Sequence, residues 1–151
     1  MLSRRRLLMA AAISPVAAIV PHTAMAAQPE IFAINGIAIH GIDPVAYFTQ
    51  GAPVRGHADH ALTWRGATWL FASMANMEAF MANPEAYCPK YGGYCAYAVA
   101  RDYLANTVPE AWTIFDGALY LNYSVNVRQL WLEDPVGNIA LADGHWPEIL
   151  G

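Results

Sequence analysis

Three pairs of turn-forming residues, each placed between two apolar runs, constrain the fold of this chain more than any other feature. Glycine, particularly after asparagine or aspartate, adopts the positive φ angles that tight two-residue hairpin turns need. The pairs are Asn35-Gly36, Arg65-Gly66 and Asp116-Gly117. They predict three antiparallel hairpins, the middle one with strands over about 61–65 and 67–72. Because nothing resembles the long crossovers that a parallel sheet requires, the expected class is α+β.

Short helices are expected beside the hairpins, because capping residues precede apolar segments. Asp43 is suited to cap a helix over about 44–49, and Pro44 fits its first turn because that position needs no backbone N–H. Ser73 precedes a helix over about 74–82, which a following Asn-Pro pair ends. The sequence therefore predicts a small single domain of antiparallel hairpins packed with short helices.

Aromatic side chains are the expected packing residues. Trp64 and Trp69 lie in the two strands of the middle hairpin, where large β-forming side chains pack well. After the third hairpin, an amphipathic helix is expected to present Val127, Leu130 and Trp131 on one face. These residues predict the core of the domain.

Residues 1–26 have the layout of a cleavable export signal. A basic start precedes an apolar segment, and the small residues Ala24 and Ala26 supply an A-x-A cleavage site. The pair Arg4-Arg5 also matches the twin-arginine pattern; ordinary threading export and a retained anchor are the alternatives. We expect cleavage after Ala26, which leaves a periplasmic or secreted domain over 27–151 with no permanent membrane span.

The charge of the expected mature chain excludes two classes of partner. Residues 1–26 hold three of the eight lysines and arginines and none of the twelve acidic residues, so the remainder carries a formal net charge of −7. Nucleic acids and anionic membranes bind proteins through neutralisation of their phosphates by basic residues. Neither is therefore an expected partner, and a small ligand or another protein is.

Several segments resemble a known family. They read "GIDPVAYFTQGAPVRG", "WRGATWLFAS", a phenylalanine at 80 followed by "NPEAY", then "YGGYCAYAVA" and "AWTIFDGALYLNYS". In this order and spacing, over about residues 35–125, the chain resembles the YHS domain family, specifically its exported bacterial members. The resemblance implies a YHS-type fold over most of the chain that follows the signal.

The resemblance also implies where a metal would bind in some members. Some branches of the family resemble small treble-clef-like metal-binding modules and occur beside copper transporters or oxygenase components. Their cysteines lie within the "DPV" segment and around the phenylalanine that ends the second hairpin. At the corresponding positions this chain has Asp43–Ala46, and Phe71–Ser73 with Asn76 further on. The thiolate ligands of such a site are missing, and no cofactor is predicted.

A soft-ion site built from other residues is a rival hypothesis. Thiols and thioethers suit an ion such as Cu(I), and imidazoles bind several transition metals. The candidate ligands are Cys95, Met74, Met77, His57 and His60. Met74, Met77 and Met81 are also spaced like an ordinary apolar helix face, for which core packing is the favoured interpretation. The two histidines are expected in a solvated connection before a strand.

The segment "YCPKYGGYCAYAVA", residues 87–100, combines two cysteines, four tyrosines and a Gly-Gly pair. Gly92 and Gly93 permit backbone conformations that a Cβ would forbid, so we expect a packed turn and helix start in which both glycines are structurally required. Tyrosine rings can also wall a small-molecule pocket. The candidate ligand-binding residues are Tyr91, Tyr94, Cys95 and Tyr97. Structural packing is the favoured alternative.

The two cysteines leave alternatives open. In an oxidising periplasm Cys88 and Cys95 would form a disulfide that closes a short loop if the turn brings them together. Separate thiols are favoured, with Cys95 behaving as a small buried apolar residue. Their spacing is not that of a thioredoxin-like C-x-x-C motif.

No catalytic residue is assigned from the sequence, because no recognised nucleophile, phosphate-binding or zinc-protease motif occurs. The leading hypothesis is an exported YHS-type domain that acts as a non-catalytic binding or accessory module. The alternatives are a periplasmic protein that handles a copper-like soft ion, and a thiol redox or other enzyme. The ligand is not identified by the sequence.

Overall fold

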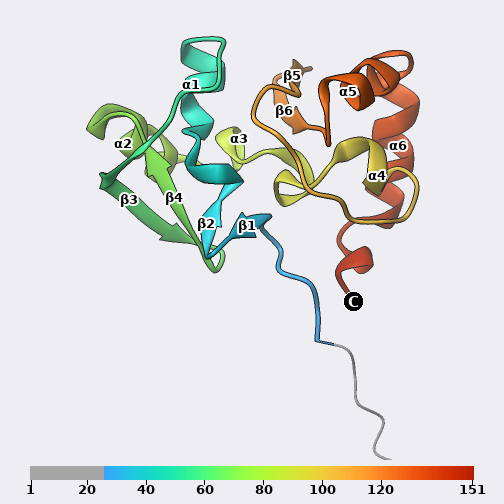
Figure 1. Ribbon diagram of the computed structural model, residues 1–151, viewed down its shortest axis with the longest axis horizontal. Coiled ribbons are helices and arrows are strands. Elements are labelled where there is room, and N and C mark those ends of the chain that lie inside the picture. The colour runs from blue at the N-terminus through green and yellow to red at the C-terminus, as the bar shows by residue number, and fades with distance from the viewer. Residues whose placement is uncertain (1–25) are drawn as a thin grey trace, which may run out of the picture.

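The computed structural model describes residues 26–151, and the segment expected to be a signal peptide lies outside this range apart from Ala26. Figure 1 shows two groups of elements side by side. We call the four-stranded sheet with α1 and α2 the N-terminal lobe, residues 33–82. We call the third hairpin with α4, α5 and α6 the C-terminal lobe, residues 96–145. The short helix α3 (Pro84–Tyr87) lies between them.

All three predicted hairpins are present. The turn residues have the positive φ angles that the sequence predicted, for example 51° at Asn35 and 80° at Gly36. The paired strands are β1 (Ala33–Ile34) with β2 (Ile37–Ala38), β3 (His57–Trp64) with β4 (Ala67–Phe71), and β5 (Trp112–Phe115) with β6 (Ala118–Leu121). The α+β class is confirmed.

The first two hairpins join into one sheet in a way that the sequence did not predict. The strand order is β1-β2-β4-β3, and β2 pairs with β4 in parallel through Ile37 and Thr68. The parallel direction is possible because the connection between β2 and β4 passes through α1 and β3 and returns. β3 also begins at His57, earlier than predicted, with a bulge between His57 and Ala61.

The predicted helix caps are confirmed. Helix α1 (Pro44–Thr49) begins after Asp43, whose carboxylate accepts the backbone N–H groups of Val45 and Ala46. Ser73 caps α2 (Met74–Ala82) in the same way. The remaining helices are α4 (Ala96–Val99), α5 (Val125–Leu132) and α6 (Pro135–His145), with short 3-10 turns η1 (Ile39–Gly41), η2 (Lys90–Gly93) and η3 (Glu148–Leu150).

One apolar core runs through both lobes, as expected for a single domain. Trp69 and Phe80 are fully buried in the N-terminal lobe, and Trp131 is fully buried in the C-terminal lobe. Trp64 is half-buried and meets the Phe80 ring edge-on at 5.4 Å between centroids. The predicted packing role of both strand tryptophans is confirmed.

Two expected apolar faces are only partly buried. Met74 and Met81 are 48% and 55% exposed, so the expectation that the methionine stripe packs in the core is wrong for both, while Met77 packs against the core. The reason is that α2 directs Phe80 into the core, and this leaves the two ends of the stripe in solvent. Leu130 is exposed although Trp131 is buried, because adjacent helix positions point about 100° apart.

None of the helices within residues 26–151 combines the length and the apolar character that a membrane crossing needs.

Candidate functional site

The tyrosine-rich segment forms the packed turn and helix start that the sequence predicted. Tyr91, Gly92 and Gly93 have φ angles of 59°, 62° and 89°, and α4 begins three residues later. A Cβ at Gly92 would overlap the carbonyl oxygen of Glu30, and one at Gly93 would lie 2.6 Å from Cγ2 of Ile39. The turn therefore presses against the segment that leads into β1, and only glycine fits at these two positions.

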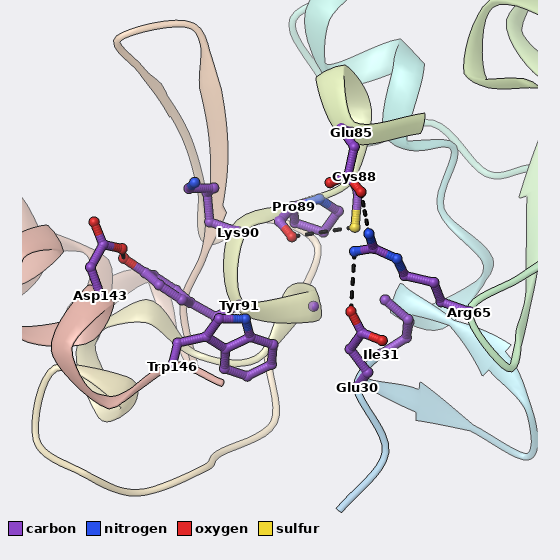
Figure 2. Close-up of a pocket in the computed structure, with 11 residues that line it drawn as sticks. Glu30, Ile31, Arg65, Glu85, Cys88, Pro89, Lys90, Tyr91, Asp143 and Trp146 are labelled. Carbon is purple, nitrogen blue, oxygen red and sulfur yellow. Dashed lines mark hydrogen bonds and ion pairs between the residues drawn. The ribbon is translucent and has the colours of Figure 1, made fainter. Parts of the chain in front are cut away.

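This turn forms one side of a cavity between the two lobes. The cavity has a volume of about 160 Å³, and we call it the interlobe cavity. Figure 2 shows a charged wall at one side and an aromatic wall at the other, with Pro89 and Lys90 between them. The side chains that carry its chemistry are Glu30, Arg65, Cys88, Tyr91, Asp143 and Trp146.

The charged wall is held by one arginine. Arg65, in the turn between β3 and β4, forms ion pairs with Glu30 at 3.1 Å and with Glu85 of α3. Its guanidinium also lies over the Trp64 ring, 4.3 Å from the centroid. Because the partners are partly exposed, the pairs add little to stability. Their effect is to tie the N-terminal segment and α3 to one side of the cavity (Figure 2).

The aromatic wall comes from η2, from α6 and from Trp146, which directly follows α6. The Tyr91 hydroxyl donates to Oδ1 of Asp143 at 2.9 Å, and its ring meets the Trp146 ring at 5.9 Å between centroids. Burial, followed by this hydrogen bond, raises the pKa of Tyr91, so the phenol stays protonated and keeps donating at neutral pH. The wall is thus an ordered surface of two rings with a carboxylate at its edge.

Cys88 contributes a thiol to the cavity. Burial raises the pKa of Cys88 to about 12, and the nearby Arg65 guanidinium opposes this only in part. The thiol donates to the carbonyl oxygen of Pro89 at 3.5 Å. Since the thiolate is the reactive form of cysteine, Cys88 is a poor nucleophile near neutral pH.

The four residues predicted to bind a ligand do not line a single cavity. Tyr91 lines the interlobe cavity, whereas the Tyr94 hydroxyl donates to the carbonyl of Pro29. Tyr97 lies beneath the Arg101 guanidinium, 3.3 Å from the ring centroid. Cys95 lies in a different cavity. The residues follow one another in sequence, but the turn at η2 and the start of α4 send their side chains in different directions.

Cys95 is buried at the start of α4. Its Sγ accepts the N–H of Tyr123 at 3.2 Å and lies 3.5 Å from Oδ1 of Asn122, to which the thiol donates. Burial raises the pKa of Cys95, and nearby backbone N–H groups counteract this only in part. Cys95 lines a separate cavity of about 160 Å³ with Tyr103, Ala105, Tyr123 and Val127. Both cysteines are free, so the possible disulfide is not formed.

The rival soft-ion ligands are distributed over different elements. His57 and His60 belong to strand β3, so the expectation of a connection before the strand is wrong, and Met74 and Met77 belong to α2. Cys95 precedes α4 in the other lobe. Within residues 26–151, no group of three or more histidine, cysteine, aspartate or glutamate side chains is placed to hold a metal ion.

Sequence reasoning missed most of the interlobe cavity. The sequence indicated a role for Arg65 only in the turn, and no motif indicated a role for Glu30, Glu85, Asp143 or Trp146. These residues come from segments far apart in the chain, so no local pattern links them. The segments that resemble the YHS family contain Arg65, Glu85 and the tyrosine-rich segment, but the resemblance assigned no function to Arg65 or Glu85.

Comparison with known proteins identifies the type of domain that the central part of the chain forms. The family model of the YHS domain matches residues 45–91, from α1 into η2. This part of the chain is a YHS domain, which confirms the family resemblance. No curated protein and no solved structure shows a significant match to the chain. The matched residues include Arg65, Cys88 and Tyr91, while Asp143 and Trp146 complete the cavity from outside the match.

Proposed function

We propose that the protein is an exported, non-catalytic binding module that holds a small ligand in the interlobe cavity. The observation that carries this proposal is the cavity itself, where an aromatic wall faces a charged wall across about 160 Å³. An apolar protein cavity of about 150 Å³ can bind benzene, so a ligand of about that size fits here. Aromatic walls with a few fixed polar groups are typical of small-molecule sites.

The chemistry of the lining supports binding rather than catalysis. The Cys88 thiol is protonated near neutral pH because burial raises its pKa to about 12. Glu30 and Glu85 are engaged by Arg65, and Asp143 accepts the Tyr91 hydroxyl. Among the described residues that line the cavity there is no histidine to act as a general base. These groups position a ligand without an activated nucleophile.

The way the chain enters the domain is compatible with cleavage after Ala26. Ala26 and Ala27 are exposed, and Gln28 is anchored through its backbone N–H to the carbonyl of Leu150 at 2.7 Å. Cleavage after Ala26 would therefore leave Gln28 and its anchor in the mature chain. The A-x-A motif supplies the cleavage signal, and the mature domain would act in the periplasm or outside the cell.

The binding proposal can be tested by ¹⁹F NMR of protein labelled with fluorotryptophan. The Trp146→Phe variant assigns the Trp146 resonance among the five tryptophans. A panel of neutral, cationic and anionic fragments of benzene size should contain members that shift this resonance saturably. Cys88→Leu, which places a larger apolar side chain in the interlobe cavity, should abolish the shift. Ala105→Leu, which places a larger apolar side chain in the Cys95 cavity, is the matched control and should leave the shift unchanged.

Two outcomes contradict the proposal. One is a panel in which no fragment shifts the Trp146 resonance. The other is a shift that persists in a folded Cys88→Leu protein, since this would place the ligand elsewhere. The midpoint of thermal unfolding is measured for Cys88→Leu and for Ala105→Leu. Equal midpoints show that the Cys88→Leu protein is folded, so that a lost shift reflects the occupied cavity and not a damaged fold.

A further inference from the structure

The buried carboxylate of Asp43 joins three elements of the N-terminal lobe. Its Oδ1 accepts the backbone N–H groups of Val45 at 2.8 Å and Ala46 at 3.3 Å, at the start of α1. Its Oδ2 accepts the backbone N–H of Ala72 at 2.9 Å and the side-chain amide of Asn76 at 2.7 Å. Asp43 has no solvent exposure. The sequence predicted the first two contacts as a helix cap, but not the last two.

The family resemblance implies that some metal-binding members carry cysteines in these two segments, around Asp43–Ala46 and around Phe71. The residues present do not fit a metal ion. Both oxygens of Asp43 face N–H donors, whose partial positive charge opposes a cation, and Ala46 and Ala72 have no ligating side chain. The Ser73 hydroxyl is engaged as the acceptor of the Asn76 backbone N–H. The donor set is therefore saturated by the chain itself.

We propose that the Asp43 hydrogen-bond centre takes the structural place of the metal ion and pins this lobe without one. We define the centre as Asp43 with the N–H groups of Val45, Ala46, Ala72 and Asn76. A structural metal stabilises a fold because its ligands come from separate elements. Asp43 likewise stabilises the lobe by joining separate elements. Its four hydrogen bonds are strong because the acceptor is charged and because burial shields them from water.

The centre also fixes the position of α1 against the rest of the domain. The Tyr47 hydroxyl of α1 donates to the carbonyl of Pro109 at 2.9 Å, and the Tyr47 ring packs against Trp112. Phe48 meets Tyr87, the chain neighbour of the cavity residue Cys88, edge-on at 5.5 Å between centroids. Asp43 thus connects the end of β4 and the start of α2 to the helix that contacts the C-terminal lobe. The fold and the cavity depend on it and not on a metal.

Urea unfolding of the whole mature domain, with and without a chelator, tests the proposal. The unfolding midpoint of the natural chain should be the same with EDTA, with added Zn²⁺ and with Cu(I) supplied under reducing conditions. Asp43→Asn should lower the folding equilibrium constant by at least about tenfold, because one or more N–H donors lose a charged acceptor. Asp59→Asn, an exposed carboxylate change in β3, is the control and should change it by no more than about twofold.

Asn76→Ala removes one of the four hydrogen bonds to Asp43 and serves as the test if Asp43→Asn does not fold. This variant should lower the folding equilibrium constant several-fold, by the same factor with and without metal. The proposal is overturned if a metal raises the unfolding midpoint of the natural chain and the rise disappears in Asn76→Ala. It is equally overturned if Asp43→Asn is as stable as Asp59→Asn.

Discussion

The packing of the Gly-Gly turn against the N-terminal segment gives a quantitative prediction. Gly92 and Gly66 both have left-handed backbone angles, with φ of 62° and 77°. A Cβ at Gly66 meets nothing within 4 Å, whereas a Cβ at Gly92 would overlap the backbone of Glu30. Gly92→Ala and Gly66→Ala therefore share the conformational penalty and differ in the clash.

The magnitude follows from what the clash must displace. An alanine in the left-handed region costs about 1 kcal/mol at either position. At Gly92 the Glu30 segment must also move, which breaks the hydrogen bond from Phe32 N–H to the Gly92 carbonyl and the one from the Tyr94 hydroxyl to Pro29. These bonds contribute about 1 kcal/mol each. Partial exposure of Phe32, which is 4% exposed in the folded chain, adds about 1–2 kcal/mol.

We therefore expect Gly92→Ala to lower the free energy of unfolding by about 4–5 kcal/mol, and Gly66→Ala by about 1 kcal/mol. Urea denaturation followed by tryptophan fluorescence and far-ultraviolet circular dichroism measures both. A Gly92→Ala chain that is already unfolded in water also meets the expectation, given the usual marginal stability of small domains. If Gly92→Ala and Gly66→Ala lower the free energy of unfolding by amounts that agree within about 1 kcal/mol, the N-terminal segment does not pack on Gly92. One wall of the interlobe cavity would then be refuted as well.

Three further outcomes are expected. Trp69→Ala should cost about 3–5 kcal/mol in the free energy of unfolding because the side chain is fully buried; a loss within error would contradict this core. Burial raises the pKa of Cys88 from 9.0 to about 12. Between pH 9 and pH 12 the unfolded chain therefore releases a proton that the folded chain keeps. The free energy of unfolding falls as the pH rises through this range, by up to about 4 kcal/mol in total. Urea titrations at pH 8 and pH 11 should show a smaller fall for Cys88→Ala, and an equal fall would show that the thiol is not buried. Replacement of Arg4 and Arg5 by lysine should retain precursor inside the cell, as immunoblots of cell fractions would show, while unaltered export would exclude the twin-arginine route.

The local elements could be predicted because their causes lie within a few residues. The Asp43-Pro44 pair caps α1, and Asn35-Gly36 forms its hairpin turn, through backbone geometry that neighbouring residues determine. The same signal, Asp134 followed by Pro135, begins α6, yet this helix was not predicted. The Asp134-Pro135 pair is thus a local signal, readable from the sequence, for the start of the helix that carries Asp143.

The sequence by itself thus determined the hairpins, most helix starts, the need for two glycines in the tyrosine-rich turn and the YHS resemblance. Only the tertiary structure decided which side chains meet. It placed Arg65 between Glu30 and Glu85, brought Trp146 to Tyr91, and separated Cys88 from Cys95 into different cavities. The physical reason is that hydrogen bonds within turns and caps are local, whereas burial depends on contacts between segments far apart in the chain.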